Sequence, residues 1–242
     1  MKRFYTQVEI SNERGILLDG KPVRTPKRAP LILPGDKLAA AVADEWRAQG
    51  EKVDPRSMPC TGLSNAAIDV IAPDPQTFAA SLAAYADTDA LCYRAVDPPD
   101  LIARQNTAWN PMIEWTRRRY DVGFEVVTGI IHQPQPRASV DRLSAEVAAR
   151  SPFELAGLAP IVTISGSLIA ALALFERDIS AVHTFDICHL DELWQVEKWG
   201  EDYFGTQTRE AHRAEFMNAA RFLSLLNEAP HKANQARLAT AT

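Results

Sequence analysis

The chain has 242 residues, of which 46% are hydrophobic and 24% are charged, a composition typical of a globular protein with a sizeable core. Its formal net charge is −5, from 26 basic and 31 acidic residues. Nucleic-acid binders usually carry a basic stripe, so no nucleic-acid partner is expected. The first residues, MKRFYTQVEI, hold no apolar signal core, so no secretion signal is predicted.

The residues up to Leu33 have the pattern of short β-strands. Thr6–Ile10 and Ile16–Leu18 are runs of β-prone residues, and Lys21–Thr25 reads as a return strand. The dipeptide Asp19-Gly20 between the last two favours a tight hairpin, because both of its residues tolerate positive φ. We predict a small antiparallel meander that needs other elements packed on it to be stable.

From Gly35 onward the apolar residues recur with a period near 3.6, which predicts helices. The first expected helix ends at Gly50, and another begins at Asp74. Further helices are expected over Leu63–Ile71, Leu101–Tyr120, Ser139–Arg150, Phe153–Ala159 and Thr206–Asn227. A kink or break is expected at Asn110-Pro111, and a strand is possible at Phe124–Thr128. The prolines after Asp97 resemble a linker. The fold class is therefore α+β: an N-terminal antiparallel β domain with packed helices (1–97), a larger α-helical domain (98–228) and a frayed or disordered tail (229–242).

Leu155–Phe175 contains no charged residue and is long enough to be considered a membrane span. However, Gly157, Pro160 and the Ser165-Gly166-Ser167 run interrupt it. We therefore expect two buried elements joined by a turn, the second being a helix over Leu168–Phe175, and no membrane insertion.

Leu190–Phe204, LDELWQVEKWGEDYF, combines two tryptophans with five carboxylates and a single cation. Read as one helix, it places Trp194 and Glu201 on nearly the same face and stacks Glu197 on Glu201. Aromatic residues anchor protein interfaces and charges select partners, so the stretch is a candidate contact surface. The alternative is that both tryptophans belong to the core and the acids only solvate the outside.

Candidates for catalysis are weak. The three cysteines (Cys60, Cys92, Cys188) lie far apart without a CxxC pair, which indicates reduced thiols in a cytosolic compartment. A thiol- or metal-dependent hydrolase using Cys92, His189 and Asp186 is the alternative function, but nearby carboxylates tend to raise a thiol pKa, and a buried free thiol is favoured. A helical metal site needs a second carboxylate–histidine helix, which the sequence lacks. No glycine-rich phosphate motif occurs, so no cofactor, metal or enzymatic activity is predicted.

Several motifs occur together and in order: FYTQVEI, LLDGKPVRTPKRAPLILP, LAAAVADEWRAQGEKVDPRSMPCTGLSNAAID, YADTDALCYRA, QNTAWNP, SGSLIAALAL and ELWQVEKWGEDYF. With these motifs the chain resembles the ATP synthase assembly chaperone family, best known from mitochondria. Its members bind the unassembled alpha subunit of the catalytic head and shield the surface that it later offers the beta subunit. Without a mitochondrial presequence ahead of the first motif, the chain resembles a bacterial, cytoplasmic member.

The resemblance implies an N-terminal β domain, a helical C-terminal domain and no catalysis. The family's acidic positions in the C-terminal domain map most naturally onto Glu192, Glu197, Glu201 and Asp202. Together with Trp194 and Trp199 these form the expected partner-binding residues. We expect Trp194 to pack inward and fix its helix, the acids to face the alpha subunit, and the free chaperone to be monomeric.

Overall fold

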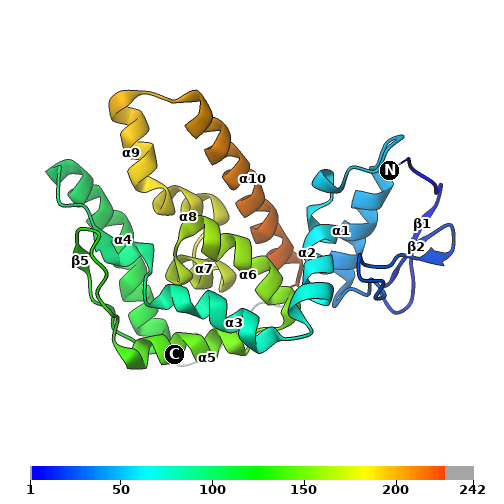
Figure 1. Ribbon diagram of the computed structural model, residues 1–242, viewed down its shortest axis with the longest axis horizontal. Coiled ribbons are helices and arrows are strands. Elements are labelled where there is room, and N and C mark those ends of the chain that lie inside the picture. The colour runs from blue at the N-terminus through cyan, green and yellow to red at the C-terminus, as the bar shows by residue number, and fades with distance from the viewer. Residues whose placement is uncertain (1, 227–242) are drawn as a thin grey trace, which may run out of the picture.

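The structure of the chain is a computed structural model, and it describes residues 2–226. A three-stranded antiparallel sheet at the N-terminus is followed by a long series of helices (Figure 1). The expected α+β class is confirmed. The tail predicted for residues 229–242 lies outside the described residues.

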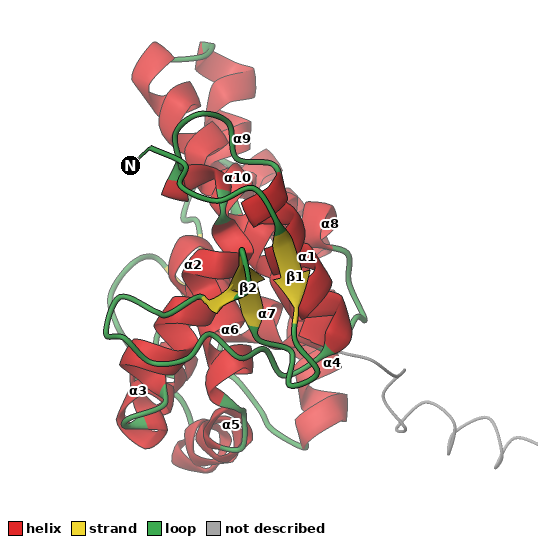
Figure 2. Cartoon of the chain, turned by 90° about the vertical axis from the view of Figure 1, so that its right-hand side faces the viewer, coloured by secondary structure: helices red, strands yellow, loops and turns green. Residues whose placement is uncertain are grey.

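The N-terminal sheet is formed by β1 (Val8–Ile10), β2 (Ile16–Leu18) and β3 (Lys21–Pro22) in sequence order. Asp19 and Gly20 connect β2 to β3 with φ values of 48° and 75°, which confirms the predicted tight turn. The return strand is shorter than expected, although the Val23 N–H just beyond it still donates to the Ile16 carbonyl at 2.8 Å. The sheet is covered on one side by α1 (Figure 2).

The first helices follow the sheet in the chain, and among them α1 packs on it. They are α1 (Asp36–Arg47), α2 (Pro59–Ala66), α3 (Pro75–Ala83) and the short helical turns Pro55–Ser57, Ala67–Ile71, Ala84–Ala86 and Ala90–Cys92. The buried carboxylate of Glu45 accepts hydrogen bonds from the backbone N–H groups of Cys60 (2.7 Å) and Thr61 (2.8 Å). These bonds satisfy free donors at the start of α2 and tie it to α1.

In the middle of the chain, α4 (Pro99–Tyr120) is followed by β5 (Val127–Thr128) and α5 (Arg137–Ala148). The prediction at Asn110-Pro111 was a break or a kink, and the break is absent because α4 is one helix through Pro111; the kink stays a prediction. Pro111 lies on the exposed side of α4, where water can satisfy the carbonyl that loses its partner. β5 pairs in parallel with β4 (Tyr93–Arg94), so only the end of the expected strand forms.

The uncharged stretch forms two helices, α6 (Pro152–Ser165) and α7 (Leu168–Phe175), as predicted. A capping box between Ser151 and Glu154 starts α6, and Gly166 ends it with a φ of 66°. Pro160 lies within α6 without ending it. None of the helices among residues 2–226 has both the length and the apolar character needed to cross a bilayer.

The chain closes with α8 (Ala181–Cys188), α9 (Leu190–Trp199) and α10 (Tyr203–Leu226). α10 begins beside α9 and runs across the molecule to α1 and α2, packing on α6 and α8 on its way (Figure 1). One hydrophobic core consequently extends from Ile16 in the sheet to Leu223 in α10. The proposed domain division at residue 97 stays a prediction, which limited proteolysis would test.

Candidate partner-binding surface

The predicted helix over Leu190–Phe204 is broken in two. α9 ends at Trp199, and Gly200 adopts φ 87° and ψ 170°, a conformation that glycine reaches without steric cost. α10 then begins at Tyr203. The prediction of one continuous helix was wrong because the glycine ends it, a role that glycine commonly has just past a helix terminus.

The break changes the positions of Glu201 and Asp202, which lie in the connection between α9 and α10. The stacking of Glu197 on Glu201, and the shared helical face of Trp194 and Glu201, are therefore also wrong. Asp202 instead caps α10: its Oδ2 accepts a hydrogen bond of 2.8 Å from the backbone N–H of Gly205. A carboxylate at this position satisfies a free donor and interacts favourably with the helix dipole.

Trp194 points inward, as predicted, with 6% of its surface exposed. Its indole Nε1–H donates to Asp100 of α4 at 3.2 Å, and its ring meets the Trp199 ring edge-to-face with centroids 5.5 Å apart. The Lys198 ammonium lies 5.3 Å from the Trp194 ring centroid and 2.9 Å from Asp100. Trp194 thereby fixes α9 against α4.

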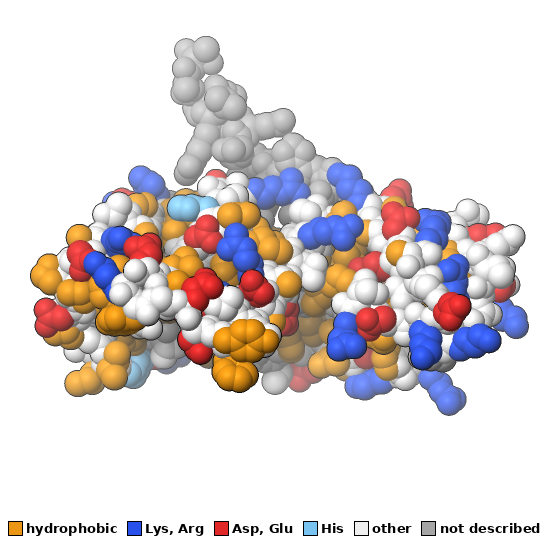
Figure 3. Space-filling view, turned by 90° about the horizontal axis from the view of Figure 1, so that it is seen from above, with side chains coloured by type: hydrophobic (Ala, Val, Ile, Leu, Met, Phe, Trp, Pro, Cys, Tyr) orange, Lys and Arg blue, Asp and Glu red, His pale blue; other side chains and the backbone are white. Residues whose placement is uncertain are grey.

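Trp199 differs from Trp194 because it is 74% exposed. Tyr203 and Phe204, which begin α10, are exposed by 69% and 74%, and their rings also meet edge-to-face. We call Trp199, Tyr203 and Phe204 the aromatic tip. Figure 3 shows hydrophobic side chains projecting beside acidic ones on the face that carries α9 and the start of α10. Exposed apolar surface of this kind usually marks an interaction site.

The acids around the aromatic tip are partly neutralised by arginines. Glu197 pairs with Arg104 of α4 at 2.7 Å, and Arg209 of α10 pairs with Glu192 at 3.1 Å and Glu201 at 3.2 Å. Arg209 is mostly buried, whereas Glu197 and Glu201 remain more than half exposed. The arginines orient the carboxylates and leave them accessible to a partner.

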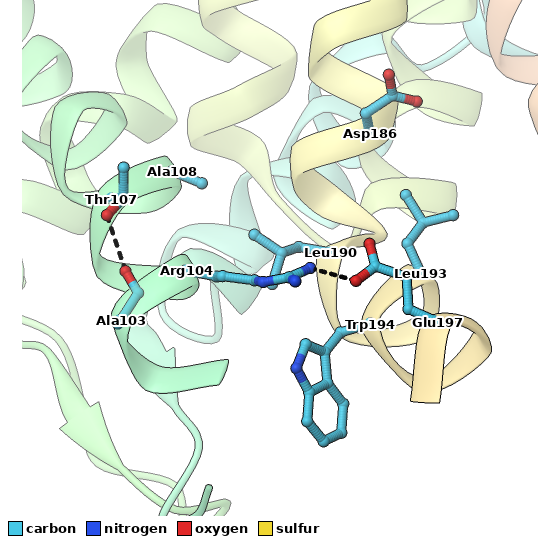
Figure 4. Close-up of a pocket in the computed structure, with 9 residues that line it drawn as sticks. All are labelled: Ala103, Arg104, Thr107, Ala108, Asp186, Leu190, Leu193, Trp194 and Glu197. Carbon is cyan, nitrogen blue, oxygen red and sulfur yellow. Dashed lines mark hydrogen bonds and ion pairs between the residues drawn. The ribbon is translucent and has the colours of Figure 1, made fainter. Parts of the chain in front are cut away.

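A groove of about 420 Å³ separates α4 from α9 below the tip. Its lining mixes apolar with polar and charged side chains: Ala103, Arg104, Thr107, Ala108, Asp186, Leu190, Leu193, Trp194 and Glu197. In Figure 4 the Arg104 side chain reaches from α4 across the groove to Glu197. The groove therefore adjoins two predicted partner-binding residues, Trp194 and Glu197, and extends the candidate surface beyond them.

The contact between α4 and α9 also depends on polar pairs. Gln105 donates to Asp191 at 2.8 Å, beside the links from Asp100 to Trp194 and Lys198. The Lys198 hydrogen bond is the main cause that lowers the pKa of Asp100, which keeps this carboxylate ionised. Exposed pairs of this type contribute little stability each, so α9 is held by Trp194 more than by its charges.

The residues of the alternative hydrolase do not form an activated nucleophile. Cys92 is completely buried, and burial followed by the nearby Asp89 charge raises the pKa of its thiol well above its usual range. His189 stacks on Phe185 with ring centroids 3.8 Å apart, and its Nδ1 lies 2.9 Å from the Phe185 carbonyl oxygen. Burial also lowers the pKa of His189. A protonated thiol without a base nearby is a poor nucleophile.

Asp186, the third residue of that alternative, pairs with Arg213 at 2.8 Å. Within the described residues, no three histidine, cysteine, aspartate or glutamate side chains are grouped closely enough to hold a metal ion. The described part of the chain thus gives the hydrolase alternative neither a reactive thiol nor a metal site.

Tyr203 and Phe204 were absent from the predicted binding residues, although both lie within Leu190–Phe204, the stretch predicted to be a contact surface. The signal was available: glycine after Trp199 ends a helix, and Asp202 before an aromatic pair is a good N-cap. The partners Arg104, Asp100 and Arg209 could not be found this way, since Arg104 is 93 residues from Glu197 in sequence.

The fold and the aromatic tip define a mostly helical α+β protein with an exposed apolar surface suited to binding another protein. The crystal structure of Atp12 from Paracoccus denitrificans has a TM-score of 0.89 and 36% identity, covering 93% of this chain and 98% of that chain. A point mutant of Atp12p from P. denitrificans has a TM-score of 0.90 and 37% identity, covering 93% of this chain and 98% of that chain. A protein from Agrobacterium tumefaciens that has been proposed to be a chaperone has a TM-score of 0.88 and 38% identity, covering 93% of this chain and 86% of that chain.

The family model described as ATP12 chaperone protein matches residues 2–117. With the similarity to the Paracoccus structure over nearly the whole chain, this match shows that the chain belongs to the ATP12 chaperone protein family. The resemblance inferred from the ordered motifs is confirmed.

Proposed function

We propose that this protein assists assembly of the catalytic head of the F-type ATP synthase by binding the unassembled alpha subunit. In this role it shields the surface through which the alpha subunit later contacts its neighbour. An isolated subunit of a ring exposes apolar interface that aggregates unless it is covered. The proposal rests on family membership and on the surface at the junction of α9 and α10.

The observation that carries the proposal is the exposure of Trp199, Tyr203 and Phe204 at one junction. Tryptophan and tyrosine supply much of the binding energy at protein interfaces because they bury a large area at low entropic cost. Exposed aromatic rings would otherwise favour self-association. A client that covers the aromatic tip gives these side chains a function.

The surrounding acids support a reversible complex. Glu197 and Glu201 are exposed at the rim of the tip, and Asp202 lies between them and α10. Rim charges mainly steer encounter and select partners, whereas the apolar centre supplies affinity. Release to the assembling ring requires an interface that is not permanently hydrophobic, and the mixed character of this surface meets that need.

The test is capture of purified alpha subunit by the full-length protein and by two variants. Replacing Trp199 and Phe204 together by alanine should weaken capture at least about tenfold, as expected for anchors at the centre of an interface. Glu197→Lys with Glu201→Lys should weaken it with a stronger dependence on salt. Circular dichroism must show that each variant remains folded.

Two controls make the result specific. Phe4→Ala changes an exposed aromatic residue of the N-terminal segment, and Glu9→Lys changes an exposed acid of β1. Both should leave capture unchanged. Equal capture by wild type and the double alanine variant would remove the aromatic tip from the interface, and no capture by wild type would overturn the proposed function.

We further propose that the protein has no enzymatic activity, acts in the bacterial cytoplasm and is monomeric when free. The relatives named from Paracoccus and Agrobacterium are bacterial proteins, which supports the compartment. Sedimentation analysis of the free protein would test the monomer.

A further inference from the structure

A second exposed apolar surface lies on the segment from Val126 to Ile131, apart from the aromatic tip. Ile130 and Ile131 are 95% and 79% exposed, and Val126 is also exposed. Val96 lies against the same segment, since a Cβ at Gly129 would be 3.8 Å from its Cγ2. We call Val96, Val126, Ile130 and Ile131 the valine–isoleucine patch.

The patch adjoins the edge of a sheet. β5 pairs in parallel with β4 through Val127↔Tyr93 and Thr128↔Arg94, and the Gly129 N–H continues the ladder by donating to Arg94 at 2.8 Å. Among residues 2–226, no strand pairs with the other edge of β5, and Val126 and Thr128 are exposed there; we call this the open edge. Open edges present backbone donors and acceptors to a further strand.

β5 is only two residues long, and shortness is one of the protections of natural edge strands, but the other protections are missing here. Natural edge strands carry charges, prolines or bulges that prevent pairing with other chains. The sequence VVTGII over 126–131 contains no charge and no proline, and most of it is β-prone. The segment is also anchored at its start, because the Gln135 side chain pairs with both the N–H (2.8 Å) and the C=O (3.0 Å) of Glu125.

We propose that an extended apolar segment of the client pairs with the open edge of β5 as an added strand. The inference rests on the proposed function, because its occupant is a segment of the same alpha subunit. Main-chain hydrogen bonds give such pairing its affinity, and alternate side chains give it specificity. Val126, Ile130 and Ile131 offer apolar contacts to those side chains.

Charge indicates what flanks the client segment. Glu125 precedes the patch and Asp97 follows Val96; both are exposed, and within the described residues neither has an ion-pair partner within 4.0 Å. Opposite charges on neighbouring strands stabilise pairing. The client segment is therefore expected to carry lysine or arginine beside its apolar residues.

The experiment combines hydrogen exchange with capture, using the full-length protein and purified alpha subunit. Binding should slow exchange of the backbone amides over 126–131. Ile130→Lys with Ile131→Lys should abolish that protection and weaken capture roughly tenfold, by placing charges beside the open edge, just past the bend at Gly129 (φ 91°). Val70→Lys, at an exposed valine on another element, is the matched control and should capture normally.

The outcomes separate this inference from the proposed function. Normal capture without slowed exchange at 126–131, or normal capture by the double lysine variant, overturns strand addition while the proposed function stands. No capture by any form overturns both. If wild type self-associates in sedimentation analysis and the double lysine variant does not, the edge pairs with a second copy and the client segment is rejected.

Discussion

Gly157 of α6 and Leu223 of α10 touch so closely that a Cβ at Gly157 would lie 2.5 Å from Leu223 Cδ2. Phe222 adds a second contact at 3.1 Å from the same position. Because α10 also carries Tyr203 and Phe204 of the aromatic tip at its other end, this contact helps to place the candidate binding surface relative to the core. Glycine serves here for its small size.

Gly157→Ala should destabilise the protein, because the added methyl group would clash with the buried side chains of Leu223 and Phe222 and push α6 and α10 apart. We expect a loss of about 1–3 kcal/mol in the free energy of unfolding. Urea unfolding followed by circular dichroism measures it. Gly62→Ala in α2 is the control: its Cβ would meet no atom within 4 Å, so helix propensity should stabilise by roughly 0.5–1 kcal/mol. Equal effects of both substitutions would contradict the close packing.

The two tryptophans of α9 should separate stability from binding. Trp194→Ala removes a buried ring and should cost about 3–5 kcal/mol of unfolding free energy. Trp199→Ala removes a 74% exposed ring and should cost less than about 1 kcal/mol. Only the Trp199 variant should lose capture while remaining stable. A large stability loss at Trp199 would show that it belongs to the core after all.

Buried Asp89 should titrate in the mildly acidic range. Its carboxylate accepts hydrogen bonds from the backbone N–H groups of Leu91 and Ile169, yet burial outweighs them and raises its pKa from 3.8 to about 6. The folded state thus binds the proton more tightly than the unfolded state. The stabilisation from Asp89 is full below pH 3.8 and is lost as the pH rises through about 6.

Asp89→Asn removes this titration. The side-chain NH2 of the asparagine also faces one of the two backbone N–H donors, so two donors meet, which should cost about 1–3 kcal/mol of unfolding free energy. The difference in unfolding free energy between wild type and Asp89→Asn should therefore grow as the pH falls from 6 toward 4. Denaturant unfolding at several pH values measures this difference. A constant difference over that range would show an ordinary pKa for Asp89.

The cysteines should be inert in the folded protein. Burial raises the pKa of Cys60 to about 12 and those of Cys92 and Cys188 above their usual range. A disulfide-exchange reagent should therefore react with the fully buried Cys60 and Cys92 only after denaturant is added, and more slowly than with a free thiol at the half-buried Cys188. Rapid modification of Cys92 in native protein would restore the hydrolase alternative.

Asp202 has two roles that a pair of substitutions can separate. Asp202→Asn retains a capping oxygen for the Gly205 N–H and removes the charge, so stability should stay within about 0.5 kcal/mol. Asp202→Ala removes the cap and should cost about 0.5–2 kcal/mol. If the charge faces the client, both variants should weaken capture of alpha subunit. Normal capture by Asp202→Asn would limit Asp202 to capping.

Local signals in the sequence were sufficient for much of the fold. The Asp19-Gly20 turn, the helix over Leu168–Phe175 and the N-terminal sheet depend on backbone preferences and apolar periodicity within a few residues, and the structure has all three. The break at Gly200 carried such a signal too, but Leu190–Phe204 was interpreted as one continuous helix.

The sequence by itself determined the family and the α+β class, because ordered motifs and periodicity are properties of the chain. Tertiary structure decided which members of Leu190–Phe204 are available to a partner. Trp194 is buried because Asp100 and α4 lie against it, while Trp199 is exposed because Gly200 turns the chain away. Residues about a hundred positions apart make these contacts, and no local pattern encodes their meeting. Burial depends on how the helices pack, and it distinguishes Trp194, which fixes α9 against α4, from Trp199, which is exposed to a partner.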